Sequence, residues 1–465
     1  MSSAQFQSLT TAQLPSMTAA QAAALGTDDL ALLSTAQVAA IGTAAFSNLS
    51  GAVITALTSD QVRGLTSTQL RAMTDTQVAA LETDDLNVML TSQVASMQAS
   101  QIGALTTAQL SVLGTTQLAA LTTAQLRAIS GANLTTLSTD QVRALTATQV
   151  GGLAASQVAG MDTDDFAALT GPQVSALSTA AIAALGTTLG QAWTTTQMQS
   201  LQATQLRALS TTVVAALESD DLNALSPSQL AGFSTTQVAA LTTDQLAALS
   251  DPLLGGLTTA QLAAIDPAKL AALGTAEFAA FSAAQLGALT TDQIVAMDTV
   301  DLASLSGTQL RGLSTAAIAA LSATQLQALT TTQAAALTTA QIRAIETADL
   351  ALMETADLAA LTAAQLPGLS TAQMRALTTA QFTSLTDTQL GALGTAQLNA
   401  LTTAQLNALD SAQFQALTTA QIAGLDTAHV TALETADLAD LSVDQVKAFG
   451  TAAIVAAAIY IAGVV

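Results

Sequence analysis

The sequence predicts an all-α solenoid built from 56 tandem octapeptide units, each a very short capped helix. Three observations predict it: an unbroken eight-residue period, a helix-start signature in most units, and two apolar columns per unit. Of the 465 residues, 50% are hydrophobic and only 2% are aromatic, so the apolar side chains are mainly Ala, Leu and Val. The length alone would suggest several domains, but the periodicity overrides that expectation.

The period is clearest in a column of glutamines that runs from Gln5 to Gln445 in steps of eight, without insertion or deletion. Gln occupies 37 of its 56 positions. Aspartate occupies eight others, namely Asp29, Asp85, Asp165, Asp221, Asp301, Asp349, Asp357 and Asp437.

Two further columns carry the predicted core. The first core column runs from Phe6 to Val446 and is bulky and apolar except at Ala22, Gly190 and Ala334. The second core column runs from Leu9 to Phe449 and is bulky and apolar at every position.

The stretch from Leu241 to Leu246 shows what one octad encodes. Thr242 followed by Gln245 is a capping box, in which each side chain satisfies a backbone N–H of the first helical turn. Leu241 and Leu246 form the matching hydrophobic staple around the cap. One octad therefore predicts one helix start.

Proline and charge support this alignment. Pro227 and Pro267 fall on the first helical position, where the missing N–H costs nothing. Acidic residues gather in the cap column and the first turn, as the helix dipole favours; those in the cap column include Glu82, Glu218, Glu346, Glu354 and Glu434. The eight arginines share one later column, which we expect to face water; they are Arg63, Arg71, Arg127, Arg143, Arg207, Arg311, Arg343 and Arg375.

A continuous helix, a strand and a disordered chain each fit the period less well. In one continuous helix, eight residues overshoot two turns by roughly 80°, so the apolar stripe would wind around every face. In a strand the two core columns would point to opposite sides of the sheet, and caps would have no role. Disordered chains are poor in large apolar residues, whereas the second core column is unbroken.

We therefore expect helices of about seven residues that depend on stacking, because isolated helices of that length do not form in water. The number of octads in one coil is left open: two would give helical hairpins, and three or four a polygonal cross-section. No superperiod of sixteen or twenty-four residues is visible.

Three departures from the pattern have structural explanations. Gly190 next to Trp193 is interpreted as a small residue that makes room for a large one, in preference to a ligand-stacking site. His429, in the glutamine column, is expected to cap its helix or to be exposed. The Asp-Asp pairs at 28–29, 84–85, 164–165 and 220–221 are interpreted as first-turn acids, since calcium-binding loop spacing is absent.

The domain organisation predicted is one solenoid over 1–449, followed by an apolar tail over 450–465. The tail is expected to plug the last coil or to dock on the first coils of another copy. Membrane insertion is a third alternative, but no integral membrane span is expected, because fourteen apolar residues are fewer than the roughly twenty that a span needs. Its candidate assembly contacts are Ile454, Val455, Ile459, Tyr460, Ile461, Val464 and Val465. The N-terminus lacks the pattern of a cleavable secretory signal.

Composition argues against several classes of function. A net charge of −22 argues against nucleic acid as a partner. With no Cys and one His, we expect no catalysis, no metal and no cofactor. We expect a structural rod, with other copies of itself as partner, forming a filament or surface layer outside a bacterial cell; a cytoplasmic location is the alternative. The competing hypothesis is a monomeric binding scaffold for a protein, a polysaccharide or an ice lattice.

Overall fold

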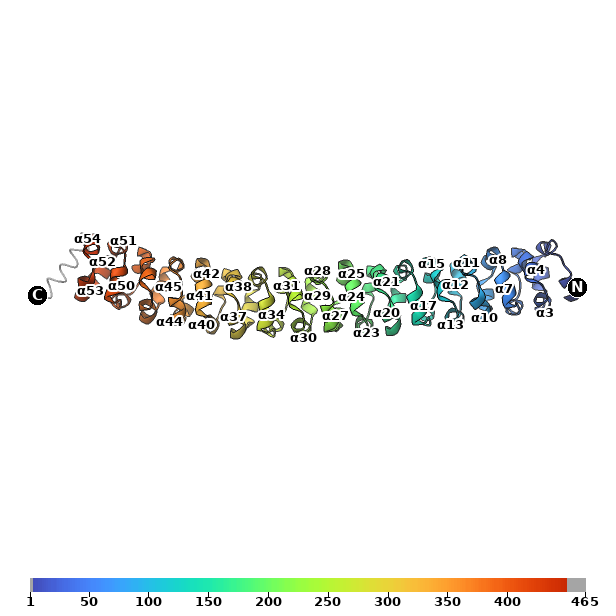
Figure 1. Cartoon of the computed structure of the whole chain (residues 1–465), viewed down its shortest axis with the longest axis horizontal. Coiled ribbons are helices and arrows are strands. Elements are labelled where there is room, and N and C mark those ends of the chain that lie inside the picture. The colour runs from blue at the N-terminus through green and yellow to red at the C-terminus, as the bar shows by residue number, and fades with distance from the viewer. Residues whose placement is uncertain (1–2, 450–465) are drawn as a thin grey trace. The chain divides into compact units, whose positions relative to one another are not determined.

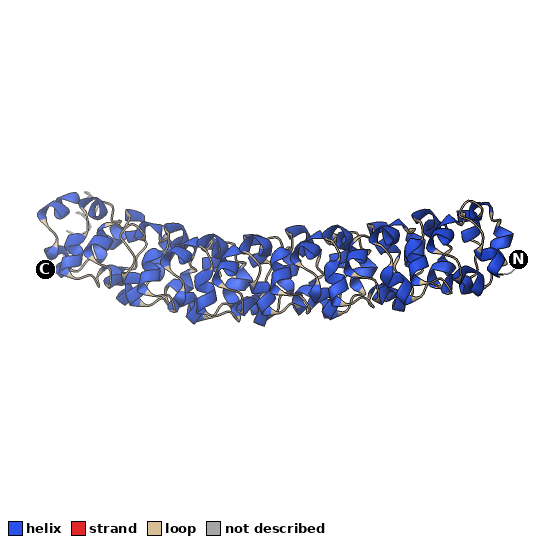
Figure 2. Cartoon of the chain, turned by 45° about the vertical axis from the view of Figure 1, so that its right-hand side comes forward, coloured by secondary structure: helices blue, strands red, loops and turns tan. Residues whose placement is uncertain are grey.

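The structure is a computed structural model that describes residues 3–449, and all regular elements within that range are short helices. Fifty-four α-helices and two 3₁₀-helices follow one another, one per octad, and no strand occurs among these residues (Figure 2). The chain divides into two compact units, 1–233 and 234–465. The predicted all-α fold of tandem short helices is confirmed.

The elements of the first unit (Figure 1) are α1 (Ser3–Gln7), η1 (Leu14–Ser16), α2 (Ala19–Ala23), α3 (Thr27–Ala31), α4 (Thr35–Ala40), α5 (Thr43–Phe46), α6 (Gly51–Thr55), α7 (Ser59–Gly64), α8 (Ser67–Ala72), α9 (Asp75–Ala79), α10 (Thr83–Val88), α11 (Thr91–Ser96), α12 (Ala99–Gly103), α13 (Thr107–Ser111), α14 (Thr115–Ala119), α15 (Thr123–Ala128), α16 (Gly131–Leu134), α17 (Thr139–Ala144), α18 (Ala147–Gly151), α19 (Ala155–Ala159), α20 (Thr163–Ala168), α21 (Gly171–Ala176), α22 (Thr179–Ala183), α23 (Thr187–Gly190), α24 (Thr195–Ser200), α25 (Ala203–Ala208), α26 (Thr211–Ala216), α27 (Ser219–Asn223) and α28 (Pro227–Leu230).

The elements of the second unit are α29 (Thr235–Ala240), α30 (Thr243–Ala247), α31 (Asp251–Gly256), α32 (Thr259–Ala263), α33 (Pro267–Ala271), α34 (Thr275–Ala280), α35 (Ala283–Gly287), α36 (Thr291–Ala296), α37 (Thr299–Ser304), α38 (Gly307–Gly312), α39 (Thr315–Ala319), α40 (Ala323–Gln327), α41 (Thr331–Ala336), α42 (Thr339–Ala344), α43 (Thr347–Leu350), α44 (Thr355–Ala359), η2 (Leu366–Gly368), α45 (Thr371–Ala376), α46 (Thr379–Thr383), α47 (Asp387–Gly391), α48 (Thr395–Leu398), α49 (Thr403–Leu406), α50 (Ser411–Ala416), α51 (Thr419–Ala423), α52 (Thr427–Ala432), α53 (Thr435–Asp440) and α54 (Val443–Ala448).

The capping boxes are present as predicted. At α8 the Thr66 N–H donates to Gln69 Oε1 at 3.0 Å, and the Gln69 N–H donates to Thr66 Oγ1 at 3.2 Å. The α-helices are four to six residues long, as in α5 and α8, which is shorter than the expected seven. The cause is the second core residue: Met73 after α8 has φ −62° and ψ 142°, so this residue already turns the chain toward the next cap.

Proline has two different effects on an octad. Pro227 and Pro267 open α28 and α33 at the first helical position, as predicted. Pro15 and Pro367 instead follow the first core residue, and their octads form the 3₁₀-helices η1 and η2. A proline inside the helix removes a backbone donor, so a full α-helical turn does not form there.

Acidic caps also fall into two classes. The Asp162 and Asp298 side chains accept the N–H of the residue three positions later at 2.8 Å. The Glu82 and Glu218 side chains occupy the same N-cap position but accept no capping hydrogen bond. The extra methylene of Glu explains the difference, because Asp is the acid with the reach of a Ser or Thr cap.

The glutamine column joins successive coils. Gln69 Nε2 donates to the Val38 and Ile41 carbonyls at 2.8 and 3.0 Å, and these residues belong to the octad four units earlier. In the second unit, Gln341 Nε2 donates to the Leu310 and Leu313 carbonyls at 2.9 and 2.8 Å. We call these repeated contacts, at sequence separations of 28 and 31, the glutamine ladder. A single side chain therefore caps its own helix and binds the preceding coil.

Helices contact one another at a different separation. α12 packs on α15 and α18 on α21 in the first unit, and α35 packs on α38 in the second, always three octads apart. At this contact Gly103 brings α12 so close to α15 that a Cβ would lie 2.6 Å from the Ala128 carbonyl oxygen. Since helices meet three octads apart and glutamines reach four octads back, one coil takes between three and four octads.

Polar residues two positions after the glutamine column add a second set of contacts between coils. Thr55 Oγ1 donates to the Ala80 carbonyl at 2.9 Å, and Asn399 Nδ2 donates to the Gly424 carbonyl at 2.7 Å, both 25 residues later. This is the arginine column. Its arginines are exposed, as predicted, although Arg311 Nε still donates to the Ala336 carbonyl at 3.2 Å.

The cap geometry makes a first testable prediction. Thr106 caps α13, where its Oγ1 accepts the Gln109 N–H at 3.3 Å, whereas the neighbouring Thr107 is exposed and caps nothing. Thr106→Ala is expected to destabilise this octad by about 1 kcal/mol. Amide hydrogen exchange across residues 105–113 measures it, and Thr107→Ala is the matched control. Equal effects of the two substitutions would contradict the assignment.

Candidate functional site

Within residues 3–449 no three His, Cys, Asp or Glu side chains are grouped so that they could bind a metal ion. In the same range, no helix has the length and apolar character needed to cross a bilayer. The features that stand out are an open pocket in the first coil and a set of buried titratable side chains.

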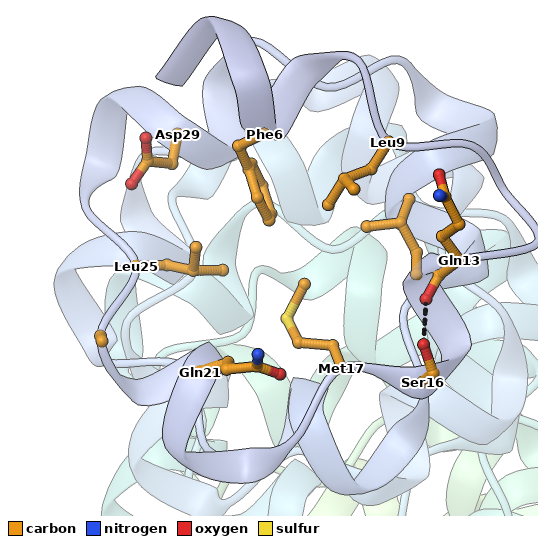
Figure 3. Close-up of a pocket in the computed structure, with 10 residues that line it drawn as sticks. Phe6, Leu9, Gln13, Ser16, Met17, Gln21, Leu25 and Asp29 are labelled. Carbon is orange, nitrogen blue, oxygen red and sulfur yellow. Dashed lines mark hydrogen bonds between the residues drawn. The ribbon is translucent and has the colours of Figure 1, made fainter. Parts of the chain in front are cut away.

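The pocket lies in the first coil and has a volume of about 560 Å³ (Figure 3). Phe6, Leu9, Met17 and Leu25 point into it, and Gln13, Gln21 and Asp29 stand around it. Its lining is thus apolar with a polar rim, and it is made of the same columns that form the core elsewhere.

The pocket is open because the first coil leaves the second core column uncovered. Leu9, Met17 and Leu25 are only half-buried, whereas Leu33 and all later described members of that column are buried. Gln13 and Gln21 are likewise exposed, while Gln61 is buried and bonded to the preceding coil. The second core column and the glutamine amides therefore face toward the N-terminal end of the solenoid.

The last described coil exposes the other core column. Val446 is 45% exposed and Leu438 is half-buried, whereas Val430 in the coil before is 1% exposed. The first core column thus faces toward the C-terminal end. Each coil has two different apolar faces, and stacking brings the first column of one coil against the second column of the next.

The candidate assembly contacts in the tail, Ile454, Val455, Ile459, Tyr460, Ile461, Val464 and Val465, lie outside the described residues. The predicted division at residue 450 lies at the same limit and stays a prediction.

Several aspartates of the glutamine column are buried carboxyls. Asp165, Asp221 and Asp301 are 3–5% exposed, and burial raises the pKa of each to about 6. Neighbouring acids on the same helix start add to the rise, Asp162 for Asp165 and Glu218 for Asp221. Burial also raises the pKa of Asp85, whose Oδ2 is buried without a hydrogen-bond partner.

Other residues in the column keep a donor. Lys269 Nζ donates to the Ala239 and Leu241 carbonyls at 2.8 and 2.7 Å, and Asn133 Nδ2 donates to the Leu105 carbonyl at 3.2 Å. His429 is 6% exposed, with Nδ1 2.8 Å from Asp426 Oδ1 and Nε2 3.0 Å from the Leu401 carbonyl. The expectation that His429 is exposed is therefore wrong. Its ring takes the place of a glutamine side chain in the glutamine ladder.

Trp193 is buried at 5% exposure and packs edge-to-face on Phe166, with ring centroids 4.9 Å apart. The interpretation of Trp193 as a packing residue is confirmed. However, Gly190 makes room for Val213 and not for Trp193. A Cβ at Gly190 would meet Val213 Cγ1 at 2.9 Å, and its nearest atoms all belong to Val213.

The glutamine column and its capping role could be predicted from the sequence alone. Its second role, donation to carbonyls of the preceding coil, needs knowledge of which octads stack. The sequence nevertheless contains a signal for this second role. Where the column has Lys269, Asn133 or His429 in place of Gln, the side chain still carries an N–H donor, although the capping bond to the N-cap backbone needs only an acceptor.

The sequence matches the ALTTAQ repeat over residues 52–83, 78–115, 94–130, 118–155, 158–192, 214–251, 262–299, 294–331, 342–375, 350–387 and 390–427, which together span well over half of the chain. The chain belongs to the ALTTAQ repeat family. A comparison with curated proteins found no match.

The name of the repeat describes the junction between two helices. In the stretch Ala120 to Gln125, Ala120 is the C-cap of α14, Leu121 is the second core residue, and Thr122 caps α15. Gln125 then completes the capping box and reaches back to the Met97 carbonyl at 2.7 Å. The six residues of an ALTTAQ unit thus contain the chain reversal, the cap and the contact between coils.

Proposed function

We propose that this ALTTAQ array is a structural, non-catalytic protein that assembles end to end, coil on coil, into a filament or a surface layer. The observation that carries the proposal is the difference between the two ends of the described solenoid. One presents the second core column in an open apolar pocket, and the other presents the first core column. These are the two faces that pack together inside the solenoid.

Association at such faces is favourable because it removes apolar surface from water. Exposure of apolar surface to water is unfavourable, and burying it lowers the free energy by roughly 25 cal/mol per Å². Head-to-tail contacts that do not close a ring generate open filaments. The tail residues from Ile454 to Val465 supply further apolar chain for the same contact. An extracellular bacterial location, and no nucleic-acid partner, belong to the proposal; the absence of Cys and the net charge of −22 support them.

The test is negative-stain electron microscopy of three proteins at equal concentration: the full chain, a version truncated after Gly450, and Met17→Asp. Met17 is half-buried in the pocket, so a carboxylate there charges the proposed contact. We expect filaments from the full chain only. As a matched control, Thr107→Asp adds the same charge at an exposed position and should leave filaments intact.

Separate short particles in every sample would overturn end-to-end assembly and favour the monomeric binding scaffold. Filaments that survive truncation but not Met17→Asp would keep the coil-on-coil contact and remove the tail from it. Analytical ultracentrifugation of the same samples gives the size distribution in solution.

A further inference from the structure

Most aspartates in the glutamine column are accompanied by a second acidic residue in the same octad. Of the eight octads with Asp in this column, seven also have an acid three residues earlier, at the N-cap. The pairs are Glu82 with Asp85, Asp162 with Asp165, Glu218 with Asp221, Asp298 with Asp301, Glu346 with Asp349, Glu354 with Asp357, and Glu434 with Asp437. In octads with Gln in the column, the cap is acidic only at Asp410. At Asp165, Asp221 and Asp301 the nearby acidic cap adds to the rise of the pKa, because two ionised carboxylates so close repel each other.

In other octads the side chain at this position donates a hydrogen bond to a backbone carbonyl of the preceding coil. Asn133 has a side chain of the same length as Asp, and its Nδ2 reaches the Leu105 carbonyl of the preceding coil at 3.2 Å. For Asp165 and Asp221 the equivalent carbonyls belong to Leu137 and Trp193, and neither accepts a hydrogen bond from any residue in 3–449. An ionised carboxylate has no hydrogen to offer them, whereas a protonated one has a single O–H.

We propose that three of these paired acids, Asp165, Asp221 and Asp301, are proton-operated clamps between coils. On taking a proton from the solvent, the carboxyl of Asp165, Asp221 or Asp301 donates its O–H to this equivalent backbone carbonyl of the preceding coil. It then performs the role that the glutamine amide performs in other octads. Release of the proton to the solvent breaks this hydrogen bond and returns a buried carboxylate that faces a carbonyl oxygen.

The surroundings of Asp165 favour the protonated form. Burial is the main cause of its pKa of about 6, and the carboxylates of Asp162 and Asp164 contribute. Of the helices in contact, α17 carries Asp140 and Arg143, both exposed, while α23 and α24 carry no charged residue. No cation in 3–449 makes an ion pair with Asp165.

Asp221 and Asp301 have the same kind of surroundings. For Asp221, burial comes first and Glu218 and Asp220 add to the rise of the pKa, while α24, which packs on α27, has no charged residue. For Asp301, burial again comes first, followed by Asp298 and by Glu277 from the adjacent α34. Lys269, four octads before Asp301, donates to the coil that precedes it.

The acidic octads also recur at regular distances. Asp165 and Asp221 in the first unit are seven octads apart, as are Asp301 and Asp357 in the second. Asp85 precedes Asp165 by ten octads, and Asp437 follows Asp357 by ten. Because one coil takes between three and four octads, seven octads amount to about two coils and ten octads to about three.

The sign of the pH dependence follows from these groups. A carboxyl whose pKa is about 6 in the folded chain and 3.8 otherwise stabilises the fold fully below pH 3.8. That contribution is lost as the pH rises through about 6. At pH 5 about nine in ten such carboxyls are protonated, and at pH 7.5 only about one in thirty. The window for the clamp is thus between pH 7.5 and pH 5.

The test compares the full chain with the triple variant Asp165→Asn, Asp221→Asn, Asp301→Asn. The unfolding midpoint is measured at pH 7.5 and pH 5. We expect the midpoint of the natural sequence to rise by several degrees on acidification. The triple variant should be more stable than the natural sequence at pH 7.5 and should lose most of that rise, because Asn supplies the donor at every pH.

A charge-matched control separates the clamp from the general effect of lowering the negative charge. Asp60→Asn, Asp75→Asn, Asp244→Asn removes three exposed acids from glutamine octads and should keep the full rise. If both triple variants show the same pH dependence, or if the clamp variant is less stable than the natural sequence at pH 7.5, the proposal is overturned. It is also overturned if calcium at pH 7.5 stabilises the natural chain while acid does not.

Discussion

Replacing Gln101 by Met is expected to destabilise the first unit locally by about 3 kcal/mol. Gln101 is 0% exposed, and its Nε2 donates to the Leu70 and Met73 carbonyls, both at 2.7 Å. Its Oε1 accepts the Gln98 N–H at 2.6 Å. Met has nearly the same length but leaves these three backbone groups without a partner in the interior, and each unpaired group costs roughly 1–3 kcal/mol before relaxation.

Amide hydrogen exchange across residues 67–106 measures this effect where it arises, because a repeat array opens in parts rather than all at once. Faster exchange is expected in α8 and α12, on both sides of the broken contact. Gln13→Met is the matched control, since the Gln13 side chain is exposed in the first coil. Equal acceleration around the two positions would show that Gln101 contributes no more than its capping bond.

Phe166→Ala is expected to cost about 3–5 kcal/mol and to change the emission of the single tryptophan. Phe166 is 0% exposed, and its ring meets Trp193 edge-to-face with an interplanar angle of 83°. Loss of the ring opens a cavity beside the indole and admits water, so Trp193 emission should shift to longer wavelength.

Phe382→Ala provides the comparison for this substitution. Phe382 is equally buried but belongs to the second unit, so its loss should cost a similar amount while Trp193 emission in the folded protein stays unchanged. Urea titrations followed by circular dichroism and by fluorescence separate the two effects. An unshifted spectrum in Phe166→Ala would show that the cavity collapses around the indole.

Much of one octad could be predicted from the sequence because its determinants are local. The capping box of Thr66 and Gln69 spans four residues, and the apolar columns that contain Leu70 and Met73 follow directly from it. The exposure of Arg71 follows from its position beside the first core residue. The predicted helix length is less accurate, since the extended conformation of Met73 ends α8 after six residues instead of the expected seven.

The stacking of octads could not be predicted, for a physical reason. The partners of Gln69 lie in the octad four units earlier, and every octad within that distance offers similar carbonyls. Propensity and patterning act within a few residues, so they contain no information on how many octads fill a coil. For the same reason, the hydrogen bonds of His429 and Lys269 to carbonyls of the preceding coil could not be predicted from the sequence.

One long-range signal in the sequence becomes visible only with the coils known. Asp29, Asp165, Asp301 and Asp437 follow one another at intervals of seventeen octads, as do Glu82, Glu218 and Glu354. With three to four octads in a coil, five is the only whole number of coils that seventeen octads can contain. The chain is therefore periodic on two scales, and neither of them is the doubled or tripled octad.

The coil of three to four octads also bears on how the length of such a chain can change. Because most octads offer their partner an equivalent pair of carbonyls, insertion or loss of one whole octad would leave later glutamines opposite such a pair, while specific contacts such as Gly190 with Val213 would be lost if the octad came between them. Insertion of half an octad would instead place a cap inside a helix and a core residue in water. We therefore expect a chain that gains or loses whole octads to keep most of its contacts between coils.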